Sequence, residues 1–97
     1  MSKSILIKDI VRERREELGL TQTELGRAMD IISGEFICLV ESGKRHIALN
    51  NLPRLAAALW LDAEGLCRCG LYEAAPAFYR STFGDSAPQR PKPLTNP

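Results

Sequence analysis

The sequence lacks the long apolar runs that mark membrane proteins. No apolar stretch approaches the roughly 18 residues needed to cross a bilayer, and the N-terminal segment, MSKSILIKDIVRERREE, becomes charged too early for a secretory leader. Three cysteines cannot all pair within one chain, and Cys67 and Cys69 lie too close together for an easy mutual bridge. We therefore expect no membrane association and a reduced, cytoplasmic protein.

The sequence also has almost no excess of charge of one sign. Thirteen Lys and Arg residues stand against twelve Asp and Glu residues, for a formal net charge of +1. This balance excludes a uniformly basic nucleic-acid-binding protein. If the chain binds DNA, a few well-placed cations must do it, and the non-specific affinity should be modest.

Motifs of catalysis and of metal binding are missing as well. The sequence has no nucleophile elbow, no phosphate-cradling glycine-rich loop and no zinc-protease motif. Structural zinc sites usually have four ligands, often in Cys-x₂-Cys pairs, but Cys67 and Cys69 would point about 200° apart on a helix. The remaining candidate ligands, Cys38 and His46, are distant in sequence.

From these absences we expect no enzyme, no metal site and no cofactor, with Cys67 and Cys69 as small buried hydrophobes. The alternative is a thiol enzyme or redox sensor that uses the two cysteines. His46 has no evident acidic partner, so it is a candidate DNA contact rather than a general base.

The apolar residues recur at helical spacing, and no alternating pattern predicts a strand. Helices are predicted over residues 5–18, 22–29 and 34–42, after Asn50 or Asn51, after Asp62, and over residues 77–83. The residues expected to face inward are Ile7, Val11, Leu18, Leu25, Ala28, Met29, Ile37, Val40, Leu52, Leu55, Ala56, Leu59, Trp60, Leu66 and Leu71.

Capping residues precede most of these segments. Thr21 followed by Glu24 is a capping box, and Ser4, Ser33 and Asp62 are further N-cap candidates. The turn 30–32 leads into Ser33. The last segment, residues 85–97, holds four prolines and one leucine. We expect it to be a disordered tail behind a folded domain of residues 1–84.

Two segments carry a resemblance to a known family. Residues 18–26 (LGLTQTELG) and 37–45 (ICLVESGKR) resemble the Cro/cI repressor type of helix-turn-helix, also called the xenobiotic-response-element family. Residues 52–59 resemble its fourth helix, and the likeness covers about residues 5–71. It implies an all-α, five-helix, lambda-repressor-like DNA-binding domain, to which this chain adds a short C-terminal helix.

In that family the second helix of the pair enters a major groove about 12 Å wide, while the first lies across the backbone. The resemblance implies that Gln22 contacts phosphate and buttresses the recognition helix, and that Arg15 and Glu41 form a structural ion pair. Lys44 and Arg45 match loop cations that grip the sugar-phosphate backbone; the alternative is a solvated loop. The DNA-contacting set is then Gln22, Thr23, Ser33, Gly34, Glu35, Phe36, Leu39, Ser42, Lys44, Arg45 and His46.

One departure from the family affects which residues face the groove. The chain has one residue more than usual between Leu25 and Val40. Counting back from Glu41 makes Ser33 the cap and Gly34, Glu35, Phe36 and Leu39 groove-facing; counting forward from Gln22 shifts these assignments by one. Glu35 suits a cytosine amino group, and Phe36 or Leu39 suits a thymine methyl. Alternatively these residues pack against protein and the DNA is read by shape.

The C-terminal aromatic residues exceed what a five-helix core requires. We expect Tyr72, Phe78, Tyr79 and Phe83 to form a homodimer interface; the alternative is that the last helix folds back onto the core. The function expected is that of a bacterial or phage transcriptional regulator, a homodimeric repressor on an inverted repeat of double-stranded DNA. The alternative is an antitoxin-like adaptor that binds a partner protein through its tail or C-terminal helices and represses its own operon.

Overall fold

The computed structural model describes residues 4–30 and 33–94. In this part of the chain the structure contains six α-helices, one 3₁₀ turn and no strand, and an isolated bridge pairs Leu61 with Pro93. The elements are α1 (Ile7–Glu17), α2 (Gln22–Met29), α3 (Gly34–Glu41), η1 (Leu49–Asn51), α4 (Leu52–Ala58), α5 (Ala63–Ala74) and α6 (Pro76–Phe83). The all-α fold and the extra C-terminal helix are confirmed.

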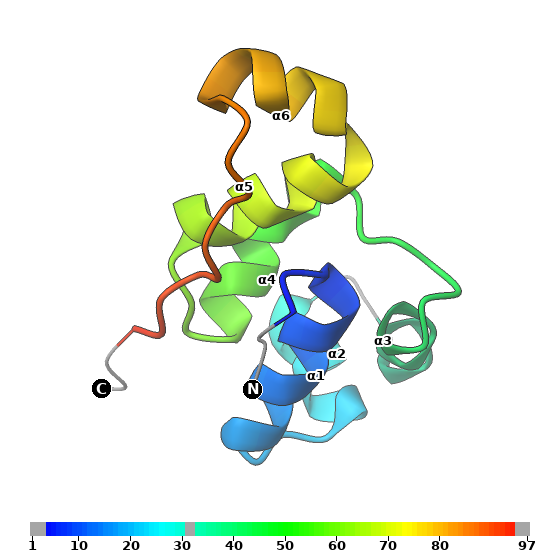
Figure 1. The fold of residues 1–97 in the computed structure, drawn as a ribbon. Helices are drawn as coiled ribbons and strands as arrows, with labels where there is room; N and C mark the ends of the chain where they lie inside the picture. The colour runs from blue at the N-terminus through cyan, green and yellow to red at the C-terminus, as the bar shows by residue number, and fades with distance from the viewer. Residues whose placement is uncertain (1–3, 31–32, 95–97) are drawn as a thin grey trace.

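The first five helices enclose one core, with α6 packed on α5 at the top of Figure 1. α2 packs mainly on α3, and α4 mainly on α5. Helices α1 to α5 each contribute apolar residues at helical spacing, as predicted. The most deeply buried large side chains are Ile10, Val11, Leu25, Met29, Ile37, Leu52, Leu55, Leu59, Leu66 and Cys69. No helix of the described residues is long and apolar enough to cross a bilayer.

Local capping sets three of the helix starts as predicted. The Thr21 N–H donates to Glu24 Oε1 at 2.8 Å, and the Glu24 N–H donates to Thr21 Oγ1 at 3.0 Å. The hydrogen bonds from Thr21 lower the pKa of Glu24. Ser33 Oγ accepts from the Phe36 N–H, and Asp62 Oδ2 accepts from the Gly65 N–H.

Two other predicted caps are wrong. α1 begins at Ile7 rather than after Ser4, and its first N–H donates to Glu73 Oε1 of α5 at 2.9 Å. Ser4 Oγ accepts from the Leu6 N–H, outside the helix. At α4 the side chain of Asn51 makes no capping hydrogen bond, because the 3₁₀ turn η1 leads directly into the helix. In both places neighbouring structure takes over the role of a local side chain.

Two residues predicted to face inward are exposed. Trp60 follows the end of α4 and has φ +53°, so the chain has already turned away and the helical spacing no longer applies. Ala28 lies on the outer side of α2, whose buried side is formed by Leu25 and Met29. The turn residues 31–32 lie outside the described residues.

The expectation of a disordered tail is wrong for residues 85–94. Pro88 and Pro91 are buried, the Asp62 N–H donates to the Lys92 carbonyl at 2.8 Å, and the Leu94 N–H donates to the Trp60 carbonyl at 2.7 Å. The segment passes down beside α5 in Figure 1, from Cys69, whose Sγ donates to the Gln89 carbonyl, to Asp62 at the start of this helix. Prolines need no hydrogen-bond partner for an N–H and have little backbone entropy to lose, so a proline-rich segment packs without forming a helix. Residues 95–97 lie outside the described residues.

Candidate nucleic-acid interface

The site is built on α2 and α3, which meet at their N-terminal ends. A Cβ on Gly34 would lie 2.6 Å from Thr23 Oγ1 and 2.7 Å from Thr23 Cα. Only glycine therefore allows the first turn of α3 to lie this close to α2. Gly34 was expected to face the groove, but the structure makes it a contact between the two helices. Ser33 is the N-cap of α3, which agrees with the register counted back from Glu41.

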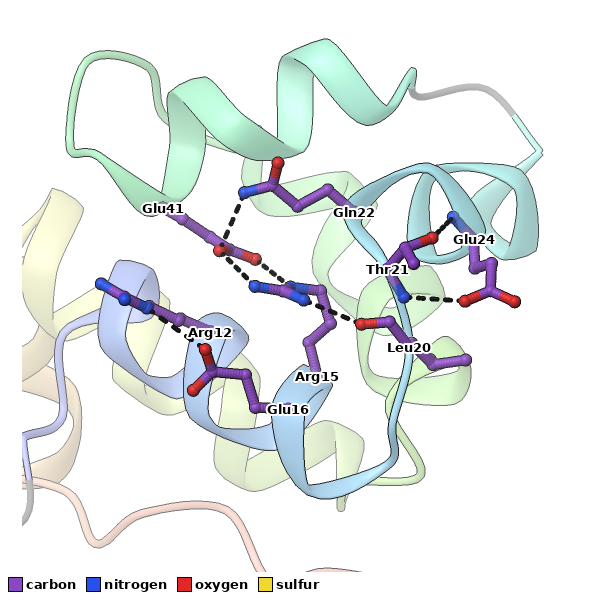
Figure 2. A network of polar contacts seen from close by, with 8 residues as sticks. All are labelled: Arg12, Arg15, Glu16, Leu20, Thr21, Gln22, Glu24 and Glu41. Carbon is purple, nitrogen blue, oxygen red and sulfur yellow. Dashed lines mark hydrogen bonds and ion pairs between the residues drawn. The ribbon is translucent and has the colours of Figure 1, made fainter.

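A buried polar cluster fixes α3 against α1 and α2 (Figure 2). Arg15 Nε donates to Glu41 Oε2 at 2.7 Å and Nη2 donates to Oε1 at 3.0 Å, with the two side chains 13% and 5% exposed. Gln22 Nε2 donates to Glu41 Oε1 at 3.1 Å, and Arg15 Nη1 donates to the Leu20 carbonyl. The hydrogen bond to Glu41 raises the pKa of Arg15. The two N–H groups of Arg15 that donate to the two carboxylate oxygens make the contact bidentate, the strong form of such contacts.

The structure thus brings Arg15, Gln22 and Glu41 together from three helices. Every hydrogen bond of the cluster is directional, so it defines the angle of α3 as well as its position. The Gln22 amide that the family resemblance assigns to phosphate also donates to Glu41. This cluster holds the outer side of α3 in one orientation, and a side chain that reads a base edge requires such a fixed orientation.

The outer side of α3 is the side opposite Ile37 and Val40, both of which are buried. Glu35, Cys38 and Ser42 are exposed there and Leu39 is half-buried, so these four residues form one stripe at helical spacing. Phe36 instead leans against the core.

Sequence reasoning missed Cys38. Helical spacing could have identified it, because Cys38 falls opposite the buried face once Ile37 and Val40 are placed in the core.

A tight cationic loop follows α3. The N–H groups of Lys44 and Arg45 both donate to the Leu39 carbonyl, at 2.9 and 3.3 Å, after Gly43 takes φ +81°. The side chains of Lys44, Arg45 and His46 are exposed. These three side chains therefore lie beside the C-terminal end of the exposed stripe, where no acidic partner neutralises Lys44 or Arg45 among the described residues.

A helix-turn-helix family model matches residues 11–65, more than half of the chain. The chain belongs to the Cro/cI-type helix-turn-helix family. This is a family of DNA-binding transcription regulators, so the chain is a DNA-binding transcription regulator. No curated protein and no solved structure shows a significant match to it.

The four C-terminal aromatic residues of this helix-turn-helix protein divide into two groups. Tyr79 is buried in its own chain, edge-on to Tyr72 at 5.1 Å between ring centroids. Phe83 packs on Tyr79 and lies under the guanidinium of Arg68, yet it is 40% exposed, and Phe78 is 59% exposed. The last helix therefore packs back onto α5 through Tyr79. Tyr79 is buried within its own chain, so the expectation that it lies in a homodimer interface is wrong, while Phe78 and Phe83 face outward.

The other two cysteines of the helix-turn-helix protein, Cys67 and Cys69, are half-buried and buried. Among the described residues no group of three His, Cys, Asp or Glu side chains could hold a metal ion. Cys69 donates its Sγ hydrogen to the Gln89 carbonyl, and burial raises its pKa to about 11. Burial also raises the pKa of Cys67. Both thiols are protonated at neutral pH and are poor nucleophiles. His46 lies with Nδ1 3.7 Å from Glu73 Oε2, an acidic partner that the sequence did not indicate.

Proposed function

We propose that this regulator is a repressor that binds an inverted-repeat operator as a homodimer, with α3 in the major groove. The observation that carries the proposal is the exposed stripe of α3, held by the Arg15–Glu41–Gln22 cluster and flanked by the exposed cations Lys44 and Arg45. α3 lies at the right of Figure 1, apart from α6 at the top, and Glu35, Cys38 and Ser42 of the stripe are exposed.

The proposal assigns roles along this surface. Glu35 accepts from a cytosine amino group, Leu39 contacts a thymine methyl and Ser42 bonds to a base edge or phosphate. The part of the Phe36 side chain that is exposed also contacts DNA. Phosphates are held by Lys44, Arg45 and His46 in the loop and by Gln22, Thr23 and Ser33 at the helix starts, where backbone N–H groups favour anions. Cys38, in the centre of the stripe, lies against the DNA.

The homodimer follows from the number of recognition helices. One chain supplies one such helix, whereas an inverted repeat is read by two, about 34 Å apart. Phe78 and Phe83 are the large exposed aromatic side chains of α6, and aromatic residues of this kind anchor protein interfaces. We assign the contact between two copies to these two residues.

The direct test is selection of bound sites from random duplexes. We expect an inverted repeat whose half-sites lie about one helical turn apart. Enrichment of a single asymmetric site, or no enrichment, would contradict the proposal. Sedimentation of Phe78→Glu should give a monomer, whereas Leu94→Glu, at an apolar residue that is 48% exposed in the C-terminal segment, should sediment like the unchanged chain.

The antitoxin-like alternative keeps one supporting observation, because Phe78 and Phe83 suit a foreign partner as well as a second copy. Its tail-based version has less support, since residues 85–94 are packed on the chain's own core. A purified chain that sediments as a monomer and binds only half-sites would favour the alternative over the homodimer.

A further inference from the structure

A groove of about 650 Å³ lies between the start of α1, the loop after α3 and the C-terminal half of α5. Its floor is apolar, formed by Val40, Ile47 and Leu52, and Leu6 and Leu49 line its edges with 44% of each residue exposed. This volume is in the range of small-molecule sites, about 300 to 1,000 Å³. The groove is separate from the outer stripe of α3, but it shares the loop that follows that helix.

One wall of the groove depends on a glycine. A Cβ on Gly70 of α5 would collide with Leu52 Cδ1 and would also lie 3.5 Å from Leu49 Cδ2. The absence of a side chain therefore allows Leu52 to lie against α5 and gives the groove a smooth apolar wall.

The mouth of the groove carries more positive than negative charge. Lys8 extends over Gly43, where a Cβ would lie 3.5 Å from its Cδ and 3.7 Å from its Nζ. Arg45 and His46 also line the mouth. Neither Lys8 nor Arg45 has an ion-pair partner among the described residues.

The one carboxylate at the mouth is already engaged. Glu73 Oε1 accepts from the Ile7 N–H at 2.9 Å, and Oε2 lies 3.7 Å from His46 Nδ1. Glu73 thus contacts the start of α1 and His46, and within residues 4–30 and 33–94 it forms no ion pair with Lys8 or Arg45.

We propose that this groove binds a small amphipathic carboxylic acid. The apolar body lies on Val40, Ile47, Leu49 and Leu52, and the carboxylate meets Lys8 and Arg45. A neutral apolar ligand would leave both cations unpaired, and a cationic ligand would be repelled by them. A carboxylate gains charge-assisted hydrogen bonds from both groups.

Occupancy of the groove opposes DNA binding, and this part of the inference rests on the proposed function. A ligand carboxylate at Arg45 competes with a DNA phosphate for the same guanidinium, because the two anions repel each other there. Because coupling between two binding sites is reciprocal, the acid releases DNA and DNA releases the acid. The groove thereby gives the regulator an inducer site beside its recognition helix.

The test of the site uses no DNA. Octanoate is titrated into the full chain by calorimetry, with octanol and octyltrimethylammonium as neutral and cationic counterparts. We expect octanoate to bind more tightly than either, with amide NMR shifts centred on Ile7, Gly43 and Gly70. Lys8→Gln and Leu49→Ser should each weaken binding about threefold to fivefold. Lys92→Gln and Leu94→Ser, two exposed residues that do not line the groove, should bind octanoate like the unchanged chain.

Absence of octanoate binding at millimolar concentration would overturn the site, and so would equal binding by the Lys8 and Leu49 variants. Equal affinity for octanoate and octanol would overturn the role of the carboxylate. In a second arm, octanoate should weaken binding of the selected operator by the unchanged chain, and Leu49→Ser should need about threefold to fivefold more octanoate for the same effect. Octanoate binding with no effect on operator affinity would overturn the coupling alone. A chain that binds octanoate but no DNA would refute the proposed function and leave the ligand site standing.

Discussion

Arg90 Nη1 donates a hydrogen bond to the carbonyl oxygen of Ser4 at 2.8 Å, across 86 residues of sequence. The same guanidinium lies with Nη2 3.1 Å from Glu13 Oε1 of α1. Together with the bonds from Asp62 to Lys92 and from Leu94 to Trp60, this contact attaches the C-terminal segment to both the start of the chain and the end of α4.

Truncation after Gly84 should therefore destabilise the fold. It removes two backbone hydrogen bonds, the Arg90 contacts and two buried prolines, for an expected loss of about 2 to 3 kcal/mol in the free energy of unfolding. Urea denaturation followed by circular dichroism measures it. Arg90→Gln should lower the midpoint and Arg80→Gln, on an exposed arginine of α6, should not. A truncated chain with an unchanged midpoint would show that the segment contributes nothing.

Loss of Glu41 should cost more than loss of a surface carboxylate. Glu41→Ala leaves the 13% exposed Arg15 side chain without its bidentate partner, and breaking such a pair costs about 3 to 5 kcal/mol. Glu16→Ala removes a carboxylate that lies 3.6 Å from Arg12 in an exposed pair on α1, and should cost under about 1 kcal/mol. Thermal denaturation of the two variants compares them, and similar midpoints would mean that the Arg15–Glu41 pair behaves as a solvated one.

Alkylation of Cys38 should block DNA binding. Cys38 is exposed on the outer stripe of α3, whereas Cys67 is half-buried and Cys69 is buried with its pKa raised to about 11. N-ethylmaleimide should therefore modify Cys38 first, as mass spectrometry can determine. The adduct should then prevent the outer stripe of α3 from entering the major groove of DNA. Cys38→Ser should bind the operator before and after treatment. Full binding by singly alkylated protein would remove this face of α3 from the interface.

Loss of the loop cations should weaken binding to every sequence alike. Lys44→Ala with Arg45→Ala removes up to two phosphate contacts, so the slope of log affinity against log salt should flatten by up to about 2 units. Fluorescence anisotropy at several salt concentrations measures the slope. The matched control is Arg80→Ala with Lys92→Ala, which changes the net charge equally at exposed residues outside the proposed surface. Equal flattening in both double variants would indicate a general charge effect.

Acid should weaken the fold in part through Glu24. Its pKa is lowered from an ordinary value of 4.5 by hydrogen bonds from Thr21, so the unfolded chain takes up this proton first as the pH falls. The stability that the carboxylate gives is fully present above pH 4.5 and is lost as the pH falls through the lower folded-state pKa. Glu24→Gln should flatten stability against pH in this range. Glu35→Gln, an exposed carboxylate outside the Thr21 cap, should leave more of the slope, and identical curves would rule out the capping box as its source.

Part of the site could be predicted because the family's residue pattern includes it. The resemblance implied that Arg15 pairs with Glu41, and the two side chains form hydrogen bonds of 2.7 and 3.0 Å. It also implied that Gln22 supports the recognition helix, and the structure shows that Gln22 does so by donating to Glu41 at 3.1 Å. Gly34 was assigned to the groove by the same pattern, but its close approach to Thr23 depends on how tightly two helices pack. Spacing along one helix gives no measure of that distance.

The sequence by itself determined the helices and three of their starts. Thr21, Ser33 and Asp62 cap N–H groups three residues away, and the apolar spacing selects the buried face of each helix, so both depend on neighbours within one or two turns. Only the tertiary structure decided that Glu73 caps α1 from 66 residues away, that Arg90 reaches Ser4, and that a polar proline-rich segment packs. The physical reason is that these groups have no partner until the core has brought distant parts of the chain together, so no local pattern in the sequence encodes the contact.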